Sequence, residues 1–368
     1  MRAIDGPRRR RPCPDAEGPP INANQRAATA DEELPALRCT NPPSSRRMTT
    51  DDGILAGRLP RLLPDDELVQ LAAGLTAIPS FTGQETQLAF HVRNTLARND
   101  IHSYHQEVQP GRLQTVARLG PDRGTPALLL HGHLDMDPPS RDHPGEPFTA
   151  RRDGDRLYGA GLHDMKGGLA AILGAAIMVR RSGIALHRPL LLAFVVGELQ
   201  GGVGTRHALR SGLTADAAVV PEPYSVRRVI TRTADALEFA EPHHAGTASD
   251  RARSAFPDTR IVLEHPLDPQ LRVGGTDMPP TDMPADRSVA RDIAELLPVV
   301  SDFRVEETGI ALPYSSCGND TAHLSRAGIE CCLFGPRGDA PGTEHHVLIS
   351  EMRACADTLA LLAARRCG

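Results

Sequence analysis

The spacing of apolar residues changes along the chain, and these changes predict alternating helices and strands. Leu68, Leu71, Leu75 and Ile78 recur at helical spacing. Elsewhere the apolar runs are continuous, which is typical of strands buried on both faces of a sheet. The predicted helices are the segment from Asp65, Glu85–Ala97, Gly167–Val179 and Val289–Val300, and the predicted strands are 101–108, 113–119, Ala127–Leu130, Leu190–Val196, Ala217–Val220 and Ile329–Phe334.

Apolar strands that alternate with helices indicate an α/β fold. We expect a doubly wound, mostly parallel sheet with helices on both faces. We expect residues 1–47, with their Arg8–Arg11 run and many prolines, to be a disordered extension before Met48. The catalytic domain is predicted over 48–229 and 283–368, and the Pro-, Asp- and His-rich segment 230–282 is expected to be a connector.

Composition excludes several classes of function. The 368 residues include 41 basic and 46 acidic side chains, so no nucleic-acid partner is expected. Aromatic residues are 3% and Trp is absent, which disfavours base stacking. No uncharged apolar stretch approaches the ~18 residues of a membrane span, so no membrane partner is expected. The seven cysteines are irregularly spaced, which favours free thiols and a cytoplasmic protein.

Polar residues that could carry chemistry follow the predicted strands, where open α/β sheets bind ligands. His133 and Asp135 come directly after 127–130, and a polar loop is the ordinary alternative. Asp164 lies in a glycine-rich segment before a predicted helix, so it is either a helix N-cap or a metal ligand. Glu198 ends a buried strand and is a candidate general base.

Two further candidates lie later in the chain. Glu222 stands between two prolines that restrict the backbone, although a surface turn would look the same. His345 and His346 are adjacent in a predicted loop, and neighbouring side chains diverge, so we expect at most one of them to be a ligand, with a solvated loop as the alternative. Imidazole and carboxylate together suit zinc, cobalt or manganese.

Other enzyme classes fit the sequence less well. The glycine loop after Glu198 suggests a dinucleotide fold, but His207 stands where the third glycine of that motif belongs. No Gly-x-Ser-x-Gly elbow is present, which disfavours a serine hydrolase. Cysteine chemistry at Cys317 is an alternative, although packing beside Asn319 and Asp320 is favoured.

The segments HGHLDMDP, LYGAGLHDMKGG, GELQGGVGT, PEP and SCGNDTAHL resemble the acetylornithine deacetylase, succinyl-diaminopimelate desuccinylase and aminoacylase group, metallopeptidase family twenty. The resemblance covers about 68–231 and 282–367 and implies an amidohydrolase with two divalent ions. It implies cleavage of N-acyl amino acids, with N-acetylornithine-like substrates expected first. A catalytically silent relative that binds a metal or a small ligand is the alternative.

The resemblance also assigns roles to the residues. His133 and Glu222 would bind one ion, Asp135 would orient His133, and Asp164 would bridge both ions, with a cis peptide bond to Met165. Glu198 would accept a proton from the attacking water. His345 would bind the second ion, with His346 as the alternative.

Three departures from the family pattern modify these expectations. Leu199 stands where family members carry a second glutamate, so we expect one tight metal site and a second that is weak or empty. Residues 230–282 are too few for the family's inserted lid domain, so we expect a truncated lid and no lid-mediated dimer. The loop before His345 lacks the usual ligand context.

Lys166, the only lysine, matches the family's Asp-Met-Lys segment; an ion pair behind the metal site would explain it, and chance survival is the alternative.

Overall fold

The computed structural model describes residues 50–139, 145–233, 278, 281–309, 318–338 and 346–368. All of them belong to one unit, Ala36–Gly368. The predicted extension 1–47, most of the predicted connector 230–282, and residues Cys317 and His345 lie outside the described residues.

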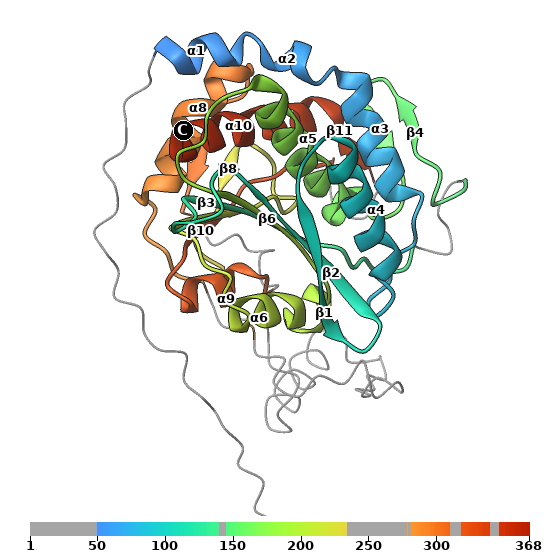
Figure 1. Cartoon of the computed structure of the whole chain (residues 1–368). Helices are drawn as coiled ribbons and strands as arrows, with labels where there is room; N and C mark the ends of the chain where they lie inside the picture. Colours follow the sequence, from blue (N-terminus) through green and yellow to red (C-terminus); the bar gives the residue numbers. More distant parts are fainter. Residues whose placement is uncertain (1–49, 140–144, 234–277, 279–280, 310–317, 339–345) are drawn as a thin grey trace, which may run out of the picture. The chain divides into compact units, whose positions relative to one another are not determined.

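A six-stranded sheet forms the centre of the described fold (Figure 1), in the order β1-β2-β6-β3-β7-β10. The pairs β6-β3, β3-β7 and β7-β10 are parallel, whereas β1-β2 and β2-β6 are antiparallel. This confirms the predicted mostly parallel α/β sheet. The strands are β1 (Ser103–Gln109), β2 (Arg112–Leu119), β3 (Leu128–His133), β6 (Leu190–Val195), β7 (Ala217–Val220) and β10 (Glu330–Leu333).

Helices cover both faces of this sheet (Figure 1). On one face lie α4, α5, α8 and α10, and on the other lie α6 and α9. The helix bounds are α1 (Thr50–Ala56), α2 (Leu59–Leu62), α3 (Asp65–Thr76), α4 (Thr86–Arg98), α5 (Gly167–Ser182), α6 (Val203–Arg210), α8 (Ser288–Val300), α9 (Thr321–Arg326) and α10 (Ile349–Cys367).

Helix α5 packs against the strand ends because its first residues are glycines. A Cβ on Gly168 would lie 2.2 Å from the carbonyl oxygen of Pro221, and one on Gly132 would lie 2.6 Å from Leu169. Among the described residues, Leu162–Ser182 has the length and composition of a membrane span, but 89% of its apolar window is buried inside the fold. This burial is that of a core helix.

Several elements were not predicted from the sequence. Strands β4 (Arg151–Asp153), β5 (Arg156–Tyr158) and β11 (His346–Leu348) form a separate sheet, and β8 (Arg228–Val229) pairs with β9 (Glu307–Thr308). These strands are too short to show a two-residue period. Helix α10 was missed because its buried face includes Glu351, Asp357 and Thr358, which interrupt the apolar stripe.

The residues that flank 234–277 lie side by side. The amide of Thr233 donates to the carbonyl of Thr281 over 2.9 Å, and the amide of Met283 donates to Thr231 over 2.9 Å. Arg232 and Asp282 form an antiparallel bridge and a 2.7 Å ion pair. The chain therefore leaves the described fold and returns to it at the same place.

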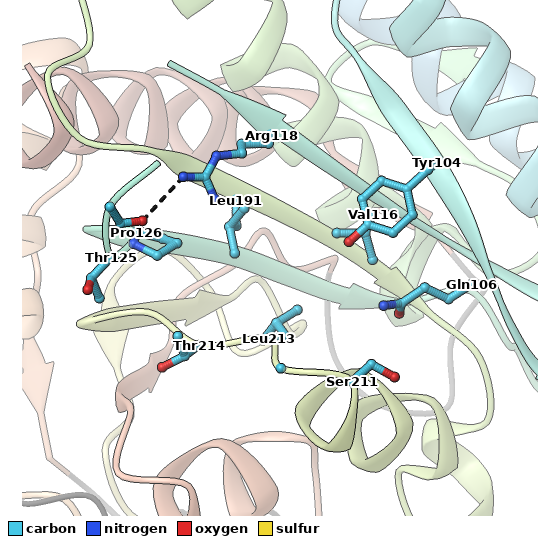
Figure 2. A pocket seen from close by; sticks show the side chains of 12 residues that line it. Tyr104, Gln106, Val116, Arg118, Thr125, Pro126, Leu191, Ser211, Leu213 and Thr214 are labelled. Atoms are coloured by element: carbon cyan, nitrogen blue, oxygen red, sulfur yellow. Dashed lines mark hydrogen bonds between the residues drawn. The ribbon is translucent and has the colours of Figure 1, made fainter. Parts of the chain in front are cut away.

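A pocket lies on the face of the sheet that carries α6 (Figure 2). Tyr104, Val116 and Leu191 line it together with the loop Ser211–Thr214. Pro126, also in its lining, precedes β3, whereas His133 ends that strand. A six-residue strand rises about 20 Å, so this pocket is separate from the candidate chemistry.

Candidate metal centre

His133, Asp164 and Glu222 converge although they are far apart in sequence. One ligand atom from each lies within 4.8 Å of the others, and no other such group of three occurs among the described residues. His133 ends β3, Glu222 follows β7, and Asp164 lies before α5. The His133 Nε2 atom is 3.1 Å from Asp164 Oδ1 and 3.8 Å from Glu222 Oε1. The parallel strand ends therefore bring together three residues singled out by sequence.

The donor set fits a divalent cation. Oε1 of Glu222 is buried and has no hydrogen-bond partner within the described part of the chain. A buried carboxylate oxygen without a donor is costly unless a cation or a proton compensates it. One imidazole nitrogen with two carboxylates is a common ligand set for zinc. The geometry therefore supports His133, Asp164 and Glu222 as ligands of one ion.

Electrostatics in the cluster also point to a missing positive charge. Burial, with the nearby Asp164 carboxylate, raises the pKa of Glu222 to about 8. Burial also lowers the pKa of His133, but its hydrogen bonds to Asp135 and Asp164 outweigh this and hold that pKa well above its usual value. The raised pKa values favour protonation of Glu222 and His133 when no cation is bound. A cation at this site would compensate the same negative charge, since metal and proton compete for the same groups.

Asp135 contacts both the histidine and the segment that carries Glu198. Its backbone carbonyl lies 2.9 Å from Nδ1 of His133, whereas its carboxylate Oδ1 lies 3.5 Å away. The carboxylate accepts hydrogen bonds from the amides of Glu198, at 3.1 Å, and Leu199, at 3.0 Å. In this geometry the carbonyl makes the shorter contact with His133, and the carboxylate holds the backbone of the next loop.

Glu198 lies on a short 3₁₀ helix, Glu198–Gln200, directly after β6. Its side chain is buried, and burial raises its pKa well above the usual value for glutamate. A buried carboxyl with a raised pKa beside a cation site has the properties of a general base. Gly197 and Gly201 flank it with φ of +68° and +76°, which glycine adopts without strain.

Leu199 is an exposed large apolar side chain next to these buried groups, with 43% of its surface accessible. Gln200, the other residue on this turn, accepts a 2.6 Å hydrogen bond from Arg112 Nη1.

Three expectations for neighbouring residues have different outcomes. His345 lies outside the described residues, and His346 is buried in β11 with its ring centroid 5.2 Å from that of Tyr158. The peptide bond between Asp164 and Met165 is cis, as the resemblance implies. The ion pair expected for Lys166 is wrong for the described residues, since its ammonium donates to the backbone carbonyl of Ile78 over 2.7 Å. Lys166 is buried, and this burial lowers its pKa to about 7.

Asp320 is a buried polar residue beside the cluster for which no role was predicted from the sequence. Asp320 precedes α9, and its Oδ2 lies 3.8 Å from Nδ1 of His131. Nε2 of His131 contacts the hydroxyl of Thr205 at 2.9 Å. Asp320 belongs to the segment SCGNDTAHL, but that segment alone did not show which strand end it would face.

Four of the expected free thiols are described. Cys331, Cys332, Cys355 and Cys367 are buried and free, and burial raises the pKa of each. Buried thiols with raised pKa values are inert.

Curated proteins are similar to part of this chain. A succinyl-diaminopimelate desuccinylase of Gluconobacter oxydans is 29% identical over 212 residues, which cover 51% of this chain and 55% of that protein. An N-formyl-4-amino-5-aminomethyl-2-methylpyrimidine deformylase of Bacillus subtilis is 33% identical over 123 residues, covering 32% of this chain and 28% of that protein. The chain spans about half the length, or less, of these relatives.

Solved structures share the fold at low sequence identity. A tripeptidase of Staphylococcus aureus superposes with a TM-score of 0.62 at 15% identity, covering 83% of this chain and all of that one (100%). Human carnosine dipeptidase 1 also superposes with a TM-score of 0.62, at 12% identity, covering 85% of this chain and 98% of that one. A dinuclear metal-binding M20 peptidase of Bacillus subtilis superposes with a TM-score of 0.55 at 14% identity, covering 82% of this chain and 97% of that one.

A family model covers the residues of the cluster and the parallel part of the sheet. The model described as Peptidase family M20/M25/M40 matches residues 129–365, more than half of the chain. The matched range contains His133, Asp164, Glu198 and Glu222. The chain therefore belongs to the M20/M25/M40 peptidase family.

Proposed function

We propose that this protein is a metal-dependent amidohydrolase that cleaves the amide of N-acyl amino acids. The observation that carries the proposal is the convergence of His133, Asp164 and Glu222 beside the buried carboxyl of Glu198. A catalytically inactive relative could keep a metal site, but its ligand binding would not require a buried acidic side chain such as Glu198 beside that site.

A divalent ion held by His133, Asp164 and Glu222 would supply Lewis acidity to a water or to the amide carbonyl. The other steps belong to the chain. Glu198, with its raised pKa, accepts a proton from the attacking water and passes it to the leaving amine. Asp135 fixes this carboxyl by holding the amides of Glu198 and Leu199.

The substrate class rests on the residue pattern and on the relatives. N-acetylornithine is the first candidate, and N-succinyl-diaminopimelate is the second because of the curated relatives' names. Both present an amide between a small acyl group and an amino acid. The test is amine release from each substrate by the full chain loaded with zinc, cobalt or manganese. Metal-dependent turnover of either supports the proposal, and no turnover with any metal favours the silent relative.

We further propose one tight metal site, because Leu199 stands where a carboxylate would hold a second ion. After zinc loading and desalting, the wild type should retain about one zinc per chain by elemental analysis. Leu199→Glu should retain about two, since the exposed position can accept a carboxylate. Two equally tight sites in the wild type would contradict the proposal.

A further inference from the structure

An ion pair outside the metal cluster reaches the segment that carries Glu198. Glu85, next to the start of α4, is fully buried, and Arg112 in β2 is 5% exposed. Arg112 donates to both carboxylate oxygens of Glu85, with Nε at 2.9 Å from Oε2. Its remaining nitrogen, Nη1, donates to Gln109 at 3.0 Å and to Gln200 at 2.6 Å.

Gln200 is the last residue of the 3₁₀ turn that begins with Glu198. It is 6% exposed, so its hydrogen bond from Arg112 is shielded from water. The guanidinium also lies against the start of this turn, because a Cβ on Gly197 would be 2.9 Å from Arg112 Nη2. Arg112 therefore contacts the turn both before and after Glu198.

The stability of the protein does not by itself account for such a pair. Burying two charges costs several kcal/mol of desolvation, and the attraction between them often does no more than offset it. A planar guanidinium with bidentate contacts does, however, fix direction well. Glu85 orients Arg112, and Arg112 presents one N–H to the turn.

We propose that Glu85, Arg112 and Gln200 form a brace that positions the general base Glu198. Asp135 accepts hydrogen bonds from the amides of the turn on the side of the metal cluster. The brace holds the same turn through the side chain of Gln200. This inference rests on the proposed function for its catalytic consequence, whereas its structural part stands independently. All three are positioning residues, because the contacts described here are with the turn and with one another.

The test compares Gln200→Leu with Gln200→Glu in the full zinc-loaded chain. Leu removes the acceptor for Arg112, whereas Glu keeps an oxygen in reach of it. Hydrogen–deuterium exchange of the peptide spanning 196–204 should be about tenfold faster in Gln200→Leu and near wild type in Gln200→Glu. Arg112→Lys, which keeps the charge but loses the bidentate geometry, should resemble Gln200→Leu.

Asp292→Asn is the matched control, since Asp292 is a buried carboxylate paired with Arg365 and Arg366 between α8 and α10. It should lower Tm but leave exchange at 196–204 unchanged. Unchanged exchange in Gln200→Leu, or equal acceleration in Asp292→Asn, would overturn the brace.

Activity gives the second readout. In Gln200→Leu, kcat should fall about 10- to 100-fold with KM within about twofold and zinc content unchanged, because only the position of the base is disturbed. Loss of zinc, or a change in KM alone, would overturn the positioning role. If the wild type hydrolyses no N-acyl amino acid, the proposed function fails, while the exchange experiment still decides whether the brace exists.

Discussion

Asp135 joins the two halves of the candidate site in a single residue. Its carbonyl lies 2.9 Å from Nδ1 of His133, and its carboxylate accepts hydrogen bonds from the amides of Glu198 and Leu199, which follow β6. Burial raises the pKa of Asp135, but its interactions with His133 and with these amides outweigh burial and lower that pKa below its usual value. Asp135 is therefore favoured in its ionised form, whereas burial raises the pKa of the neighbouring Glu198 and Glu222, so the anchoring carboxylate differs from both in its electrostatic environment.

The role of Glu198 can be tested without disturbing the metal ligands. Glu198→Gln keeps the shape of the side chain but cannot accept a proton. We expect kcat to fall by about 10²- to 10⁴-fold while zinc content stays at the wild-type level. Steady-state kinetics and elemental analysis of the same preparations measure both. A variant with wild-type kcat would show that another group is the base.

Asp320 should make the metal-free protein less stable as pH rises. Burial raises its pKa from 3.8 to about 7, so between these values the folded state binds a proton that the unfolded state lacks. Its contribution to the free energy of unfolding therefore falls from about pH 4 to about pH 7 and is constant above. The difference is on the order of 4 kcal/mol at most.

Asp320→Asn removes this titration while keeping the shape of the protonated acid. Urea unfolding should show the variant more stable than wild type at pH 8, with the difference shrinking steadily as the pH falls toward 4. An equal difference at both pH values would mean that Asp320 does not carry the effect.

At the scale of elements, the site is built from connections after strands. β3, β6 and β7 are neighbours in the sheet, and they end at His133, near Glu198 and near Glu222. Because parallel strands end on one edge, residues about 90 positions apart in sequence meet there. The buried strands supply the rigidity, and the glycine-rich connections allow close approach.

The paired segments at 230–233 and 281–283 predict that 234–277 is dispensable for folding of the described unit. Replacing 234–277 by Asn-Gly leaves a five-residue connection, a common length between antiparallel strands. We expect the shortened chain to keep its circular dichroism spectrum, one cooperative thermal transition and its zinc content. A molten or insoluble product would show that the segment contributes to the core.

At the scale of the whole molecule, metal binding should stabilise the fold. The three ligands come from connections that separate when the chain unfolds, so zinc binds the folded state preferentially. Zinc at 100 times its dissociation constant adds about 2.7 kcal/mol. Thermal unfolding with and without zinc should show a clear rise in Tm for wild type and almost none for Glu222→Gln.

The control for this experiment is Glu306→Gln, which alters an exposed carboxylate paired with Arg227. It should keep the full rise in Tm. An equal rise in Glu222→Gln would remove Glu222 from the ligand set.

The amino-acid sequence was enough to predict the six strands of the central sheet, helices α3, α4, α5 and α8, and the type of chemistry. Continuous apolar runs identified β3, β6, β7 and β10 because strands buried on both faces have no polar alternation. His133 and Glu222 follow two of these runs, where such a sheet binds ligands, and Asp164 stands in a glycine-rich segment before a predicted helix. Local pattern therefore sufficed wherever burial or chemistry was expressed in adjacent residues.

How these residues are held could not be predicted from the sequence. The pairing of Arg112 with Gln200, 88 positions apart, leaves no periodic trace in the sequence. The carboxylate of Asp135 was expected to act on His133, but in the folded chain the amides of Glu198 and Leu199 are its closer partners. Hydrogen bonds depend on distance and direction, and for residues this far apart in sequence the packing of the whole sheet sets both.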